Sequence, residues 1–135
     1  MPRDRPVRLT SDLLTRLVEE AERAYPAECC GILRGDRSAI EAIQPARNVH
    51  PTPRSHFEID PQALIDAHRD ARGGGLPVAG YYHSHPEGRA VPSQTDQAMS
   101  AGDNSIWAII AGEHVRLFLD GEDGFTPLPY VVSKR

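Results

Sequence analysis

The sequence predicts an α/β protein of the α+β type, built from a mixed, largely antiparallel sheet with flanking helices. Two segments have apolar residues at three- and four-residue intervals, which is typical of amphipathic helices. Several short runs rich in β-branched and aromatic residues are separated by glycine-containing turn signals, which is typical of strands. The composition does not shift along the 135 residues, so we expect a single domain spanning residues 1–135.

The N-terminal half is expected to hold two helices separated by strands and a loop. The expected elements are, in order, a helix over residues 9–25, strands over 28–33 and 38–43, a loop over 44–55, a short strand over 56–59 and a helix from residue 60 to the three glycines at 73–75. Thr10 or Ser11 would cap the first helix, and Pro26 would end it. Asp60 followed by Pro61 is a typical helix start, with an N-cap acid and a proline in the first turn.

The C-terminal half is expected to contain most of the strands. The expected elements are a strand over residues 78–82, a loop over 87–92, a helix over 93–101, strands over 106–110 and 115–119, and a last strand over 130–132. Residues 106–110 are apolar throughout, which indicates a central strand covered on both faces. Asp-Gly turn signals precede the last strand.

The charge and hydropathy of the chain exclude several classes of partner. The formal net charge is -4, and no run of Lys or Arg provides a surface for nucleic acid or an anionic membrane. No apolar run approaches the roughly 20 residues of a transmembrane helix. The N-terminus lacks the apolar core of a signal peptide. We therefore expect a cytoplasmic protein with no nucleic acid and no membrane as partner.

Cys29 and Cys30 are the only cysteines, and they are adjacent. Neighbouring cysteines rarely form a disulfide with each other, because the required geometry strains the peptide between them. A cysteine-rich zinc site would need further cysteines. We expect two reduced thiols that pack in the core, although Cys30 at the start of a strand could also sense oxidation.

Two histidines near the end of the 78–82 strand are the candidate centre of the chemistry. Side chains alternate along a strand, so His83 and His85 would point to one face while Ser84 points away. Two imidazoles on one face can bind one metal ion, and Asp96 is a third candidate ligand brought back by the following turn. Three protein ligands leave one tetrahedral position open, as in a catalytic rather than a structural zinc site.

The same residues carry a resemblance to a known family. His83-Ser84-His85-Pro86 is followed, at the matching seven-residue spacing, by Ser93-Gln94-Thr95-Asp96, and an upstream segment at 26–31 contains Glu28. This pattern resembles the motif of the JAMM (MPN+) zinc metallopeptidases, in their compact prokaryotic form. The resemblance covers most of the chain and implies the curved sheet of the cytidine-deaminase-like MPN fold.

The resemblance also implies a role for each residue of the motif. One Zn²⁺ per chain would be held by His83, His85 and Asp96. Glu28 would be the general base, and Ser93 would stabilise the oxyanion. Each feature taken alone has a simpler interpretation: Ser93-x-x-Asp96 is also a helix capping box, and Glu28 alone would be an ordinary solvated carboxylate. The joint occurrence at family spacing favours the metal site. No role is assigned to the other histidines, which are His50, His56, His68 and His114.

The function that the resemblance implies is hydrolysis of amide bonds after the C-terminal tail of ubiquitin-like or sulfur-carrier proteins. The leaving group could be a lysine-linked protein, cysteine or a few C-terminal residues, and the sequence leaves these open. Segment 47–56 is the predicted lining of the substrate groove, and a homodimer is one alternative for the assembly. Two other functions remain as alternatives: a zinc amidase of small molecules, and a non-catalytic scaffold of the same fold.

Overall fold

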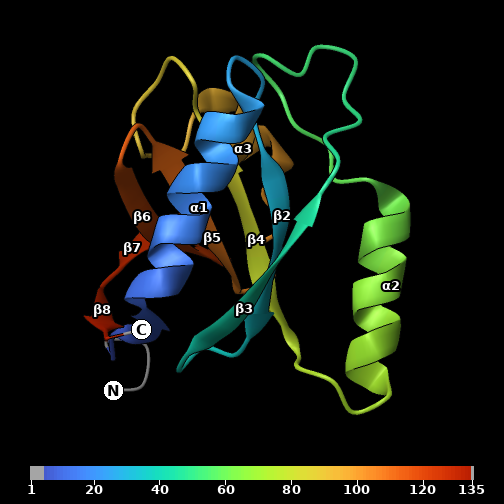
Figure 1. Ribbon diagram of the computed structural model, residues 1–135, viewed down its shortest axis with the longest axis vertical. Helices are drawn as coiled ribbons and strands as arrows, with labels where there is room; N and C mark the ends of the chain where they lie inside the picture. Colours follow the sequence, from blue (N-terminus) through green and yellow to red (C-terminus); the bar gives the residue numbers. More distant parts are fainter. Residues whose placement is uncertain (1–4, 135) are drawn as a thin grey trace.

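The structure is a computed structural model that describes residues 5–134 and contains two sheets and three helices (Figure 1). Its elements are β1 (Val7–Thr10), α1 (Ser11–Ala24), β2 (Cys30–Gly35), β3 (Ile40–Ala46), α2 (Pro61–Arg72), β4 (Val78–Ser84), α3 (Gln94–Met99), β5 (Ser105–Ala111), β6 (His114–Gly121), β7 (Gly124–Leu128) and β8 (Tyr130–Ser133). No helix within residues 5–134 combines the length and the apolar character needed to cross a membrane.

The main sheet has six strands in the order β3-β2-β4-β5-β6-β7. The β4–β5 pair is parallel, and the other four neighbouring pairs are antiparallel. The connection between the two parallel strands contains α3, so the chain leaves the end of β4 and crosses back to the side of the sheet where β4 begins before it enters β5. The predicted α+β class with a mixed, largely antiparallel sheet is confirmed, and β5 is the buried central strand that its apolar run predicts.

The predicted start of the first helix at residue 9 is wrong. Val7–Thr10 is a strand, β1, which pairs in parallel with β8 at the other end of the chain (Figure 1). Val7 and Leu9 are buried while Arg8 between them is exposed, as expected of a strand with one covered face. Thr10 is the N-cap of α1, and its hydroxyl oxygen accepts a hydrogen bond of 3.2 Å from the Leu13 amide.

Three further strand predictions are corrected. Residues 56–59 form no strand and contribute only an isolated bridge between Asn48 and Ile59. β3 runs to Ala46 rather than ending at residue 43, and β7 was not predicted at all. Each of these two strands contains a proline, Pro45 or Pro127. Both strands lie at an edge of the main sheet, the position in which a proline within a strand is tolerated.

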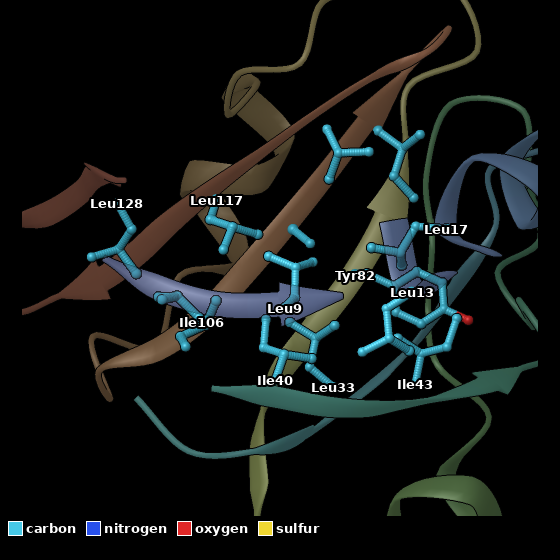
Figure 2. Close-up of a cluster of buried hydrophobic side chains, with 14 of the residues drawn as sticks. Leu9, Leu13, Leu17, Leu33, Ile40, Ile43, Tyr82, Ile106, Leu117 and Leu128 are labelled. Atoms are coloured by element: carbon cyan, nitrogen blue, oxygen red, sulfur yellow. The ribbon is translucent and has the colours of Figure 1, made fainter. Parts of the chain in front are cut away.

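The main sheet is covered by different layers on its two faces. On one face, α1 places Leu13 and Leu17 against Tyr82 and other buried residues of the strands (Figure 2). On the opposite face, a smaller cluster joins Cys30, Phe57, Ile59 and Trp107, with Ala63 and Leu64 of α2 packed against it. Successive residues of β4 therefore face different layers, and His83 shares its face with the smaller cluster.

Gly31 in β2 makes the packing of Tyr82 on the α1 face possible. A Cβ at position 31 would lie 2.3 Å from the Tyr82 ring, far inside contact distance. The absence of a side chain lets this ring lie directly over β2. The two cysteines beside it are free and buried, one in each layer, which confirms their predicted packing role.

Candidate metal centre

The candidate centre lies where β4 ends and α3 begins. His83 is near the end of β4, and His85 follows the last residue of that strand. Asp96 is the third residue of α3. Its side chain turns back to accept a hydrogen bond from the backbone at the helix N-terminus, which lies near the end of β4. The turn between β4 and α3 thus brings residues from both ends of the motif together, as the sequence predicts.

The His83 ring is held in place by aromatic neighbours. It stacks on Phe57 with ring centroids 4.3 Å apart and an interplanar angle of 17°. Trp107 of β5 meets it edge-on at 5.6 Å. Only 1% of His83 is exposed, so its orientation is set by packing before any ligand binds. Phe57 and Trp107 were not predicted as site residues, and no local sequence signal connects them to His83.

His83, His85 and Asp96, here called the His-His-Asp cluster, bring three donor atoms to one point. The two Nε2 atoms are 3.1 Å apart. His83 Nε2 is 3.0 Å from Asp96 Oδ1, and His85 Nε2 is 3.1 Å from Asp96 Oδ2. Within residues 5–134 this is the one group of three or more such side chains whose donor atoms all lie within 4.8 Å of one another.

Backbone contacts orient two of the three side chains. His85 Nδ1 lies 2.7 Å from the Arg89 carbonyl oxygen and donates to it, which turns Nε2 toward the cluster. Asp96 Oδ2 accepts a 3.0 Å hydrogen bond from the Ser93 amide, and Ser93 Oγ accepts one of 3.1 Å from the Asp96 amide. This is the capping box that the sequence predicts, and it places Asp96 in the cluster at the same time.

The electrostatics of the cluster suit metal ligands. Burial alone raises the pKa of Asp96, but hydrogen bonds from both histidines outweigh this and hold its pKa well below the usual range. Burial lowers the pKa of His83, which favours the neutral imidazole. Burial also lowers the pKa of His85, but its hydrogen bonds with Asp96 and the Arg89 carbonyl outweigh this and raise that pKa overall, so His85 gives up its extra proton when a cation binds. An ionised carboxylate and a neutral imidazole are the forms that bind a cation.

The donor set fits a single divalent ion such as Zn²⁺. Two imidazole nitrogens and one carboxylate oxygen are ligands that zinc takes in proteins, and three such ligands leave a coordination position for a substrate or water. The contact between His85 and a backbone carbonyl is the kind of second interaction that orients metal-binding histidines.

Glu28 lies just before β2, with 7% of its surface exposed. Burial raises its pKa to about 7; the charge of His85 lowers it and that of Asp96 raises it. The carboxyl group is therefore within electrostatic reach of the cluster, although it comes from a segment far from His83 in the sequence. Its raised pKa allows it to gain and lose a proton near neutral pH.

Three surface pockets adjoin these residues. One, of about 380 Å³, is lined by Phe57 and Trp107, which pack on His83. A second, of about 320 Å³, is lined by His85 and Tyr25. A third, of about 420 Å³, is lined by Glu28, Asn48 and Pro53, among others. The second pocket therefore exposes His85, and the third exposes Glu28.

The other histidines lie outside the cluster. His50 and His56 stack on each other, with ring centroids 4.7 Å apart and an interplanar angle of 12°. His68 lies on α2 and His114 at the start of β6. None of these four belongs to the group of donors described above.

The fold is that of JAB1/MPN domains. Among solved structures, a JAB1/MPN domain protein from Archaeoglobus fulgidus shares the fold, with a TM-score of 0.61 over 94% of this chain and 99% of that chain at 18% identity. A protein from Desulfitobacterium hafniense matches with a TM-score of 0.82 over 96% of this chain and 94% of that chain at 28% identity.

The chain belongs to the prokaryotic homologs of the JAB domain, whose family model matches residues 10–120. It is 35% identical over 99 residues to a desampylase from Haloferax volcanii, covering 72% of this chain and 71% of the relative. It is 37% identical over 97 residues to a probable TtuB-protein conjugate cleaving protease from Thermus thermophilus. That match covers 72% of this chain and 64% of the relative, just under two thirds of its length.

Proposed function

We propose that this protein is a zinc-dependent metallopeptidase that hydrolyses amide bonds after the C-terminal tail of ubiquitin-like or sulfur-carrier proteins. The observation that carries the proposal is the His-His-Asp cluster beside a buried carboxyl group whose pKa is raised to about 7. Support for the substrate class comes from the similar chains, one named a desampylase and one a protease that cleaves protein conjugates.

His83, His85 and Asp96 would hold the zinc ion. When bound there, zinc supplies a Lewis acid and lowers the pKa of water in the site toward neutrality. His85 enters this arrangement already oriented, because its Nδ1 proton is donated to the Arg89 carbonyl. The ionised Asp96 balances part of the charge of the cation.

Glu28 is the proposed general base and acid. Its carboxylate would accept a proton from the attacking water and then deliver that proton to the nitrogen of the leaving amine. An acid with a pKa of 4.5 would bind the proton too weakly at neutral pH to deliver it efficiently. Burial raises the pKa of Glu28 to about 7, which matches both steps.

Ser93 is the proposed oxyanion stabiliser. Attack on the amide carbonyl places negative charge on its oxygen, and a hydroxyl donor aimed at that oxygen stabilises the transition state. The capping hydrogen bond uses a lone pair of Ser93 Oγ as acceptor and leaves the hydroxyl proton for another acceptor. Capping the helix and stabilising the oxyanion are therefore compatible roles.

The tail of the substrate is proposed to lie in an extended form beside the cluster. Extended peptides commonly bind at sheet edges, where backbone hydrogen bonds hold the chain and pockets accept side chains. The 380 Å³ pocket beside Phe57 and Trp107 offers apolar walls for such side chains. Segment 47–56 remains the proposed lining on the Glu28 side, where Asn48 and Pro53 border the third pocket.

The test is incubation of the zinc-loaded protein with ubiquitin-like proteins of the same host, each carrying a lysine-linked partner, a C-terminal cysteine or a short C-terminal extension. Products are identified by mass. We expect the wild type to cleave the amide bond that follows the tail and Glu28→Gln to release no product. Tight zinc binding without cleavage of any of these substrates would contradict the proposal, leaving a small-molecule amidase. Absence of zinc binding would leave the non-catalytic scaffold as the remaining alternative.

A further inference from the structure

Glu28 is held by hydrogen bonds that do not belong to the sheet. It precedes β2, so neither of its backbone polar groups has a partner on a neighbouring strand. Its amide donates instead to the Pro53 carbonyl at 2.7 Å, and its carbonyl accepts from Asn48 Nδ2 at 3.0 Å. Both partners come from the loop between β3 and α2. The backbone position of Glu28 therefore depends on that loop.

The Asn48 side chain is the centre of this connection. Its Nδ2 donates to the carbonyls of Glu28 and His56, each at 3.0 Å. Its Oδ1 accepts from the amides of His50 at 3.1 Å and Glu58 at 3.0 Å. A side-chain amide has two donors and two acceptor lone pairs, so the full capacity of the group is used.

Only asparagine satisfies all four contacts at this position. Aspartate has the same shape but places an oxygen, not an N–H, against the Glu28 carbonyl. Serine is too short to reach both ends of the loop, and glutamine places the amide farther from the backbone. The side chain is half-buried, so a lost contact is not simply replaced by bulk water.

We propose that Asn48 is a positioning residue for Glu28. This inference rests on the proposed function. By binding the Glu28 carbonyl, Asn48 fixes the backbone from which the carboxyl group extends toward the cluster. Displacement of a catalytic group by about 1 Å can reduce turnover by roughly 10²-fold, so a single hydrogen bond at this point has a large kinetic effect.

The test uses Asn48→Asp in the zinc-loaded enzyme. The change keeps the two acceptor contacts and removes both donors. We expect zinc content equal to that of wild type, unchanged KM and kcat lower by roughly 10²-fold. Asn104→Asp is the matched control, because it makes the same chemical change at an exposed position in the loop before β5. If Asn48→Asp does not fold, Asn48→Ser, whose side chain is too short to reach the Glu28 carbonyl and adds no charge, carries the same expectation.

A purely structural role for Asn48 would give a different result. If it only shaped a loop that contacts substrate, KM would rise and kcat would stay at the wild-type value, and this outcome would overturn the inference. A readout independent of turnover is the NMR signal of the Glu28 carbonyl carbon and the Cys29 amide nitrogen. Both should shift in Asn48→Asp, and unchanged signals would equally overturn it. An inactive wild type would refute the proposed function itself, whereas an active wild type with normal kcat in Asn48→Asp refutes only the role of Asn48.

Discussion

Replacement of Glu28 by glutamine should stabilise the zinc-free protein at neutral and alkaline pH but not at acidic pH. Folding buries the carboxyl group and raises its pKa from 4.5 to about 7. Below pH 4.5 the group is protonated in both the folded and the unfolded protein, so it affects stability little. As the pH rises through 7, the folded protein must ionise a group that the unfolded protein ionises more readily. The free energy of unfolding of the wild type therefore falls between pH 4.5 and 7.

The size of the effect follows from the difference between the two pKa values. Each pKa unit corresponds to about 1.36 kcal/mol, so this shift destabilises the wild type by about 3 kcal/mol once the pH exceeds the pKa of Glu28 in the folded protein. Glutamine has a similar shape and no charge at any pH. We expect the free energy of unfolding of Glu28→Gln to exceed that of wild type by about 3 kcal/mol at pH 8 and to differ little from it at pH 4.

Urea denaturation with a metal chelator present, at pH 4, 6 and 8, measures this difference. Glu113→Gln, at an exposed position in the β5–β6 turn, corrects for the loss of one negative charge from the surface. Repeating the titration with zinc should shrink the difference, because a cation in the cluster favours the ionised carboxylate. A difference between Glu28→Gln and wild type that is the same at pH 4 and pH 8 would refute the reasoning, since it would mean that the folded carboxyl group is not desolvated.

The remaining predictions concern the residues of the centre. Glu28→Gln should bind zinc with wild-type stoichiometry and lose peptidase activity, and turnover retained in this variant would remove the general-base role. His83→Ala or His85→Ala should lose tight zinc binding together with activity; metal analysis showing equal zinc in variant and wild type would contradict their role as ligands. Ser93→Ala should keep zinc and lower kcat by roughly 10²–10³-fold. It should also lose about 1 kcal/mol of stability as a helix cap, and a normal kcat would leave capping as its role.

Much of the candidate centre could be predicted because its residues lie within a few short stretches of the sequence. The strand end that carries His83 and His85 and the capping box of Ser93 and Asp96 depend on alternation and on local hydrogen bonds, which a sequence pattern reveals. The structure adds the distances, with three donor atoms within 4.8 Å of one another. The structure also shows that the pKa of Glu28 is raised. No local sequence pattern could indicate this, because segments distant in the sequence bury the carboxyl group.

The errors share one cause. The expected helix takes in Leu9 and Thr10, the last two residues of β1, because the strand partner of β1 is β8 at the other end of the chain. β7 has little alternation and contains Pro127, and it is a strand because β6 provides a partner along its length. Residues 56–59 look like a strand but find no continuous partner. Whether a short segment becomes a strand is decided by what lies beside it.

The class of fold, the main helices, the central apolar strand and the residues of the expected metal site can all be inferred from the order of the amino acids. These follow from periodicity, capping and spacing within a few turns of chain. The packing of Phe57 and Trp107 on His83, the hydrogen bond from Asn48 to the Glu28 carbonyl and the burial of the Glu28 carboxyl group become visible only in the folded domain. These contacts join segments far apart in the chain, so their energies depend on the folded arrangement of the whole domain.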